Sequence, residues 1–124
     1  MAFYVEDGEI YITRGDDAYI ECSITTDDGS EYPMQADDVI TLTVRELPRA
    51  DSPALLSVRG APGGTRIILR GADTEGIEAG RYSADMQLST GDGRRYTFWP
   101  QLEGDSRYKT RNLKNFIVMP EVTV

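Results

Sequence analysis

Alternation of apolar and polar side chains marks three stretches of the chain. In each stretch every second residue is apolar, and most residues between are polar or charged. The apolar members are Ala18, Ile20, Cys22 and Ile24 in the first stretch, Ile40, Leu42 and Val44 in the second, and Tyr82, Ala84, Met86 and Leu88 in the third. A period of two is typical of a strand with one buried face. The pattern therefore predicts half-buried strands over residues 18–25, 39–46 and 82–88.

Shorter apolar runs between turn-forming residues predict the other strands. Two such runs are residues 2–5 and 10–13, and residues 115–124 form an apolar run interrupted by Pro120. Residues 54–59 and 65–70 flank a Pro-Gly-Gly turn, so we expect them to pair as a short antiparallel unit. Residues 94–102 follow a Gly-rich turn and should form a hairpin with the strand before it. Residues 71–76 are predicted to make one helical turn with Asp73 as its cap.

The residues that open the third stretch have the outline of a tyrosine corner, which is found in immunoglobulin (Ig)-like sandwiches. Ile77, two residues, Gly80, one residue and Tyr82 precede the alternation. Gly80 allows a sharp turn, and the ring of Tyr82 can be buried while its hydroxyl bonds to backbone a few residues upstream. This stretch predicts the corner around which the sandwich is arranged.

These features together predict an all-β, Ig-like antiparallel β-sandwich of about 7–9 short strands. The chain has 124 residues, so we expect a single domain over residues 1–124. Cys22 is the only cysteine, which excludes an intramolecular disulfide and an antibody-type Cys…Trp…Cys framework. We expect Cys22 to act as a small buried hydrophobic residue.

The charge balance is acidic. The chain carries 21 acidic and 13 basic residues, a net charge of −8. Nucleic acid and anionic membrane surfaces attract clustered Lys and Arg, so we expect neither as a partner. Residues 1–64 have a net charge of −9 and residues 65–124 a net charge of +1. This asymmetry is either a solvated surface or a means of pairing copies or partners head to tail. No secretion leader or membrane-spanning run is visible in the sequence.

Catalytic chemistry finds little support in the residue types. The chain contains no histidine, which excludes Ser-His-Asp and Cys-His arrangements, and its one cysteine cannot build a zinc site. A carboxylate pair could serve a glycosidase, but a small sandwich offers little cleft for a sugar chain. We therefore expect a protein that is not an enzyme and that uses no cofactor or metal.

Two loop motifs have a binding interpretation beside a structural one. Arg14-Gly15-Asp16 is the tripeptide that integrins recognise, but Gly15 stands where a strand must turn, which favours a structural role. Paired aspartates at residues 16–17, 27–28 and 37–38 could ligate Ca²⁺ if their loops converged at one end of the sandwich. None of them matches an EF-hand loop, so solvated turns are the default interpretation.

Aromatic and basic residues of the second half supply the candidates for an interface. Tyr96, Phe98 and Trp99 share one predicted strand, so at least one ring must lie on each face. Core packing is favoured for Tyr96 and Phe98, whereas Trp99 has the opposite parity and is favoured for an interface. The candidate interface residues are Trp99, Arg94, Arg95, Arg107, Lys109 and Arg111.

Several short motifs resemble the N-terminal domain of phage baseplate upper proteins, the BppU-like Ig-fold domains of tailed phages and prophages. The matching residues are 14–18 before an alternating run, Asp28-Gly29, the run at 39–45, Ala72-Asp73-Thr74, then Ile77, Gly80, Tyr82, Asp85 and Leu88, Asp92-Gly93, Tyr96-Thr97, and the closing residues 116–118 and 122–123. The resemblance spans nearly the whole chain.

This resemblance implies a structural docking module of a phage or prophage tail. Its partners would be other baseplate or tail-tip proteins, with a homo-oligomer as a further option. It would be synthesised in the cytoplasm of a bacterial host and located in the virion tail. Two alternatives stay open: a carbohydrate-binding or adhesive Ig-like module, which needs exposed aromatics near polar loops, and an Ig-like accessory domain of an enzyme.

Overall fold

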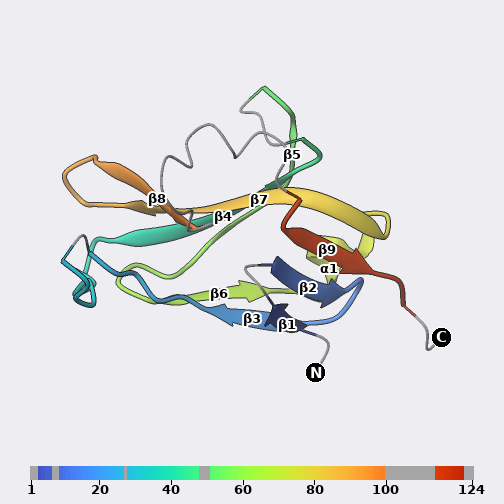
Figure 1. Ribbon diagram of the computed structural model, residues 1–124, viewed down its shortest axis with the longest axis horizontal. Helices are drawn as coiled ribbons and strands as arrows, with labels where there is room; N and C mark the ends of the chain where they lie inside the picture. Colours follow the sequence, from blue (N-terminus) through green and yellow to red (C-terminus); the bar gives the residue numbers. More distant parts are fainter. Residues whose placement is uncertain (1–2, 7–8, 27, 48–50, 100–113, 122–124) are drawn as a thin grey trace.

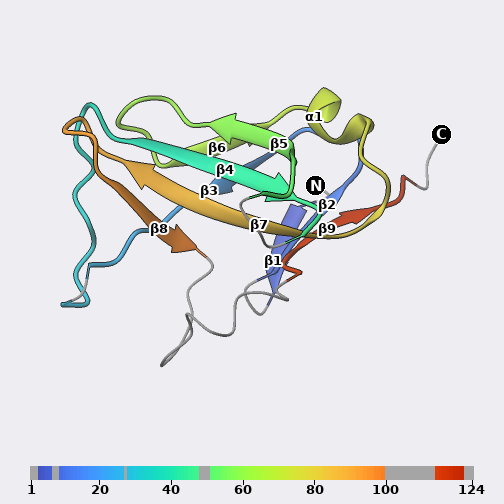
Figure 2. The same cartoon turned by 90° about the horizontal axis from the view of Figure 1, so that it is seen from above.

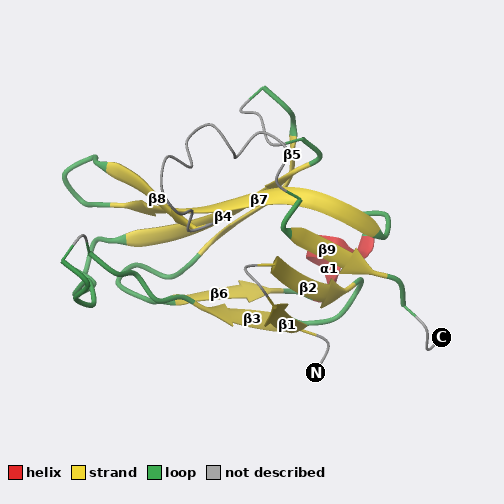
Figure 3. Cartoon of the chain, viewed as in Figure 1, coloured by secondary structure: helices red, strands yellow, loops and turns green. Residues whose placement is uncertain are grey.

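The computed structural model describes residues 3–6, 9–26, 28–47, 51–99 and 114–121. Nine strands and one short helix follow one another in these residues (Figures 1 and 3). They are β1 (Phe3–Glu6), β2 (Glu9–Thr13), β3 (Ala18–Glu21), β4 (Val39–Arg45), β5 (Ala54–Arg59), β6 (Arg66–Leu69), α1 (Gly71–Glu75), β7 (Gly80–Ser89), β8 (Arg95–Trp99) and β9 (Phe116–Met119).

The strands form two sheets. The larger has seven strands in the order β1-β2-β9-β7-β4-β5, with β8 also paired to β7, and the smaller consists of β3 and β6. β6 and β3 lie beneath β4 and β7 in Figure 1, and Figure 2 shows β5, β4 and β7 side by side from above. The predicted all-β sandwich is confirmed. One pairing is not antiparallel, because β2 runs parallel to β9.

The core lies between the two sheets and is filled by the alternating apolar residues. Its buried members include Ile10 and Ile12 of β2, Ala18 and Ile20 of β3, Ile40, Leu42 and Val44 of β4, Ile67 and Leu69 of β6, Ala84, Met86 and Leu88 of β7, and Phe116 and Val118 of β9. β3 ends at Glu21, earlier than predicted. Cys22 is only half-buried beside this core, and desolvation, followed by the charge of Glu21, raises the pKa of its thiol to about 11.

The tyrosine corner is present at the start of the longest strand, β7. The Tyr82 hydroxyl donates a hydrogen bond to the carbonyl oxygen of Glu78, 2.6 Å away, and the Tyr82 ring packs partly against the core. Desolvation is the first cause that raises the pKa of this phenol. Because the bond closes over four residues, it fixes the angle at which β7 leaves the preceding loop.

A buried side chain completes the edge of β7 opposite β4. β9 pairs with residues 80–82 of that edge and β8 with residues 86–89. Between them, the Asn115 side chain accepts a hydrogen bond from the Ala84 N–H at 2.7 Å and donates one to the Ala84 carbonyl at 2.9 Å. Asn115 is 1% exposed. Its amide therefore takes the place of a strand backbone where neither neighbour reaches.

The expected pairing of residues 54–59 with residues 65–70 is wrong. β5 pairs with β4 in the large sheet, whereas β6 pairs with β3 in the small one. The turn between them carries the chain from one layer to the other, and Gly63 adopts a φ of +76° within it. Pro and Gly indicate that the chain changes direction, but not whether it returns to the same sheet.

Asp73 also differs from its expected place. It is the third residue of α1, and the residue that precedes the helix is Arg70. The Asp73 carboxylate reaches back to accept a hydrogen bond from the Arg70 N–H at 2.8 Å. Asp73 is therefore not the cap residue: it lies in the first turn of the helix, and its carboxylate accepts from the backbone N–H of the cap residue, Arg70, which would otherwise have no partner in the helix.

Candidate functional site

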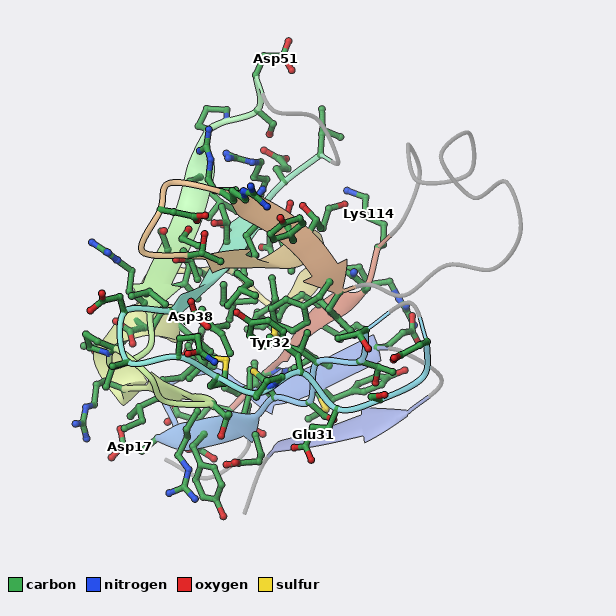
Figure 4. All side chains as sticks on the ribbon, turned by 90° about the vertical axis from the view of Figure 1, so that its left-hand side faces the viewer. Asp17, Glu31, Tyr32, Asp38, Asp51 and Lys114 are labelled. Carbon is green, nitrogen blue, oxygen red and sulfur yellow. The ribbon has the colours of Figure 1, made fainter. Side chains whose placement is uncertain are left out.

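A groove of about 840 Å³ opens at one end of the sandwich. The β7–β8 hairpin forms one side and the chain between β3 and β4 forms the other. We call it the end groove, and its lining includes Thr25, Thr26, Tyr32, Gln35, Asp37, Asp38, Asp92, Arg94, Tyr96 and Phe98. Figure 4 looks onto this end of the molecule, with Tyr32 and Asp38 labelled. The groove combines aromatic rings with short polar side chains.

A hydrogen-bonded pair fixes one side of the end groove. Asp38 is 1% exposed, and one oxygen of its carboxylate accepts hydrogen bonds from the Tyr32 hydroxyl at 2.7 Å and from the Gln35 N–H at 2.8 Å. The bond to Asp38 is the main cause that raises the pKa of Tyr32. Because Asp38 is buried and its bond to Tyr32 is 2.7 Å long, the Tyr32 hydroxyl is held in place before any ligand arrives.

The opposite side is the tight turn of the hairpin. Gly93 adopts a φ of +90°, and the Asp92 carboxylate accepts a hydrogen bond from the Thr90 hydroxyl, which is the first cause that lowers the pKa of Asp92. Arg94 lies 3.4 Å from Asp92 in an exposed ion pair. Its pKa is raised first by a side-chain hydrogen bond with Tyr96. Arg94 therefore lies beside the Asp92 carboxylate on the exposed part of the hairpin.

Asp37 links the two sides. A Cβ on Gly91 would lie 2.8 Å from the Cβ of Asp37, so only glycine leaves room for this carboxylate against the hairpin turn. Asp37 is exposed, and no hydrogen bond or ion pair joins its side chain to another residue of the described ranges. Its carboxylate is therefore available to a ligand.

The aromatic residues of β8 lie differently from the prediction. The pairing shifts between Met86 and Gln87, so Trp99 lies opposite Met86, while Thr97 lies opposite Gln87. Phe98 is the extra residue of this bulge, and a bulge changes the face on which later side chains point. Trp99 and Phe98 are half-buried against the core. The prediction that Tyr96 packs in the core is wrong, because Tyr96 is 50% exposed. The prediction that Trp99 lies on the face opposite to Phe98 is also wrong, because both rings pack against the core.

The other sequence-predicted interface residues fall into two groups. Arg94 and Arg95 are exposed on the hairpin, and Arg94 lines the end groove. Arg107, Lys109 and Arg111 lie outside the described residues. The structure therefore brings only Arg94 together with the aromatic residue Tyr96 in one site.

The Arg-Gly-Asp tripeptide forms a turn that packs on α1. The Gly15 N–H donates to the Thr74 hydroxyl at 2.9 Å, and the Gly71 N–H donates to the Asp17 carboxylate at 2.6 Å. Gly15 has a φ of +86°. These bonds join the turn to α1, which is a structural role for the tripeptide. Among the described residues no group of three or more acidic, Cys or His side chains could hold a metal ion.

A second surface lies on the outer face of the small sheet, and sequence analysis did not single it out. Tyr19 of β3 and Ile68 of β6 are direct cross-strand partners and are 44% and 46% exposed. The Arg66 guanidinium lies 4.4 Å from the centre of the Tyr19 ring and 3.0 Å from the Glu21 carboxylate. We call these four residues the outer face. Tyr19 and Ile68 occupy positions that alternate with the buried residues of their strands, where polar side chains are expected, and this signal in the sequence could have revealed the surface.

Comparison of the chain with protein-family models, with curated proteins and with solved structures finds no match. The likeness to baseplate upper proteins therefore stays a prediction from motifs. None of the helices in the described ranges has the length and apolar character needed to cross a membrane.

Proposed function

We propose that this chain is a non-enzymatic docking module of a phage or prophage tail, which binds another baseplate or tail-tip protein through the outer face. The observation that carries the proposal is that Tyr19 and Ile68, which are paired across the two-stranded sheet, are both exposed. Large apolar side chains in contact on a surface mark sites of protein association. Tyrosine is also among the residues that dominate binding energies at interfaces.

The polar neighbours hold this face ready for a partner. The Glu21 carboxylate accepts hydrogen bonds from Thr65 at 2.8 Å and from Arg66 at 3.0 Å, and Arg66 in turn covers part of the Tyr19 ring. The bond from Thr65 is the first cause that lowers the pKa of Glu21. Side chains that are already ordered lose less entropy on binding, so the same contact area gives a higher affinity.

The edges of the small sheet offer a second type of contact. β3 and β6 pair only with each other within the described ranges. The Cys22 N–H bonds to the Thr65 carbonyl, and hydrogen-bonded pairs alternate along an antiparallel ladder. The backbone groups of Tyr19 and Glu21 therefore point away from β6. A free edge of this kind can accept an extended segment of a partner as an additional strand.

Charge and motif positions support the choice of partner. The outer face belongs in part to the first 64 residues, whose net charge is −9, so a partner with a basic surface would associate faster and in one orientation. The motifs that resemble baseplate upper proteins fall on defined structural positions: Gly80 and Tyr82 form the corner, and Asp92-Gly93 forms the hairpin turn. The resemblance of these motifs is the reason why we propose a tail protein as the partner.

Co-sedimentation with tail particles tests the proposal. Epitope-tagged wild-type chain and the double variant Tyr19→Ser, Ile68→Ser would be produced in the source cells during prophage induction. We expect the wild type in the particle fraction and the double variant there at less than about one tenth of that amount, the change expected for about 1.4 kcal/mol. Tyr96→Ser, a comparably exposed tyrosine, is the matched control and should co-sediment normally. Equal recovery of all three chains would refute a role for the outer face.

A further inference from the structure

We propose that the end groove binds a neutral saccharide. This inference concerns a surface other than the outer face and does not depend on the docking proposal. It rests on the size of the groove, on the exposed ring of Tyr96, and on the donors and acceptors that surround this ring.

The end groove has the dimensions of a small-molecule site. Its volume of about 840 Å³ lies within the range of roughly 300–1,000 Å³ found for ligand pockets. Its walls are the hairpin turn and the chain before β4 (Figure 4), and it is partly open to solvent. An open groove suits an extended ligand made of several similar units better than a compact ligand that must be enclosed.

The aromatic groups give the groove its apolar contact surface. Tyr96 is 50% exposed, and Tyr32 and Phe98 line the same groove while packing partly on the core. A tyrosine ring combines an apolar face with a polar edge, so it suits ligands that have both characters. The CH-rich face of a pyranose ring is such a ligand surface.

The polar groups set the ligand class. Asp37 and Asp92 supply acceptors, and Arg94 and Gln35 supply donors in the same groove. The lining contains three carboxylates, counting buried Asp38, and one guanidinium, a balance that disfavours phosphates and other anions. A wholly apolar ligand would remove these groups from water without replacing their hydrogen bonds, at a large cost. Neighbouring hydroxyl groups of a neutral sugar can both donate to the carboxylates and accept from Arg94.

The walls are fixed before binding, which favours recognition of a flexible chain. The Tyr32 hydroxyl is hydrogen-bonded to Asp38, and Asp37 packs against Gly91. In the turn before Tyr32, the Asp28 carboxylate accepts hydrogen bonds from the Thr26 hydroxyl and the Ser30 N–H. The bond from Thr26 is the main cause that lowers the pKa of Asp28 to about 2. Preorganised walls reduce the entropy that binding must overcome.

Nuclear magnetic resonance titration of the ¹⁵N-labelled chain tests this site. Maltotriose, cellotriose and tri-N-acetylchitotriose would each be added to about 10 mM, a concentration that detects Kd values in the millimolar range. We expect at least one of them to shift the amide signals of the groove residues, and Tyr96→Ala and Arg94→Gln each to weaken that binding about tenfold. Tyr19→Ala removes a tyrosine of similar exposure from the outer face and should leave the affinity unchanged.

Other outcomes overturn the proposal. If none of the three sugars shifts the groove signals, or if a shift persists in both groove variants while their melting temperatures match the wild type, the groove is not a saccharide site. Binding of a Lys-rich peptide instead, weakened by salt, would identify a cationic ligand and contradict the assignment. Arg94 lies in an exposed ion pair, so its variant remains informative even if Tyr96→Ala unfolds. Particle association of the Tyr96 variant separates this test from that of docking.

Discussion

Replacing Asn115 probes how the sandwich closes the free edge of β7. In the native chain the Asn115 amide bonds to both the N–H and the carbonyl of Ala84, at 2.7 and 2.9 Å, in a region where both residues are buried. Asn115→Ala leaves a donor and an acceptor of the Ala84 backbone without partners. Each such buried group costs about 1–3 kcal/mol, so the free energy of unfolding should fall by about 2–6 kcal/mol.

This loss is large compared with a total stability of about 5–15 kcal/mol. For a domain of this size it corresponds to a melting temperature lowered by at least about 6 °C. Urea unfolding followed by circular dichroism measures the difference. Gln87→Ala is the matched control, because Gln87 lies on β7, as Ala84 does, and its side chain makes one exposed 3.3 Å hydrogen bond to Thr97 of β8. It should change stability by less than about 0.5 kcal/mol. Equal effects of the two variants would refute the role given to Asn115.

A carboxyl group at the same position adds a test with a defined pH dependence. In Asn115→Asp the new carboxylate would face the Ala84 carbonyl in a buried place, so its folded-state pKa should rise above the unfolded value of about 3.9. A raised folded-state pKa means that stability is full below the unfolded pKa and is lost as pH rises through the folded-state pKa. Relative to wild type at each pH, the variant should therefore be more stable at pH 4 than at pH 7. A constant difference would contradict the buried placement.

Three further predictions concern other parts of the fold. Tyr82→Phe removes the corner hydrogen bond and should lower the free energy of unfolding by about 0.5–1.5 kcal/mol in a urea titration, whereas no change would show that the corner bond is dispensable. The pKa of the Cys22 thiol is raised from 9.0 to about 11, and only the thiolate reacts, so at pH 8 Ellman's reagent should modify the folded chain about 100-fold more slowly than the unfolded chain. Similar rates would contradict the desolvated placement of Cys22. The stability that the neutral thiol provides should be lost as the pH rises from 9 to 11. Gly71→Ala would place a Cβ against the Gly15 carbonyl oxygen and should destabilise by more than about 1 kcal/mol in thermal melts, whereas Gly76→Ala meets nothing within 4 Å and should not.

The strands could be predicted because burial of one face is a local property. The alternation of β4 and β7 matches the buried side chains of the structure, and the corner before β7 follows from the spacing of Gly80 and Tyr82. Pairing is not local. β5 and β6 join different sheets although only six residues separate them, and β2 finds β9 from the other end of the chain.

The candidate site could be predicted only in part. Arg94 and the aromatic residues of β8 were recognisable as a cluster, but the bulge at Phe98 placed Trp99 opposite buried Met86. Tyr96 precedes the bulge and is exposed although it lies opposite buried Leu88. One extra residue is enough to exchange the two faces of a strand, and alternation alone does not reveal it. The second wall, formed by Tyr32 and Asp37, is far from β8 in sequence and is brought to it by the path of the chain before β4.

The account of this chain as a tail protein is tested most directly by immunogold electron microscopy. Antibody raised against the chain would be applied to particles released from the source cells after prophage induction, with uninduced cells as the control. We expect gold at the tail tip or baseplate of intact particles. Intact tailed particles without gold, in a culture where the protein is detected by the same antibody, would contradict the docking function.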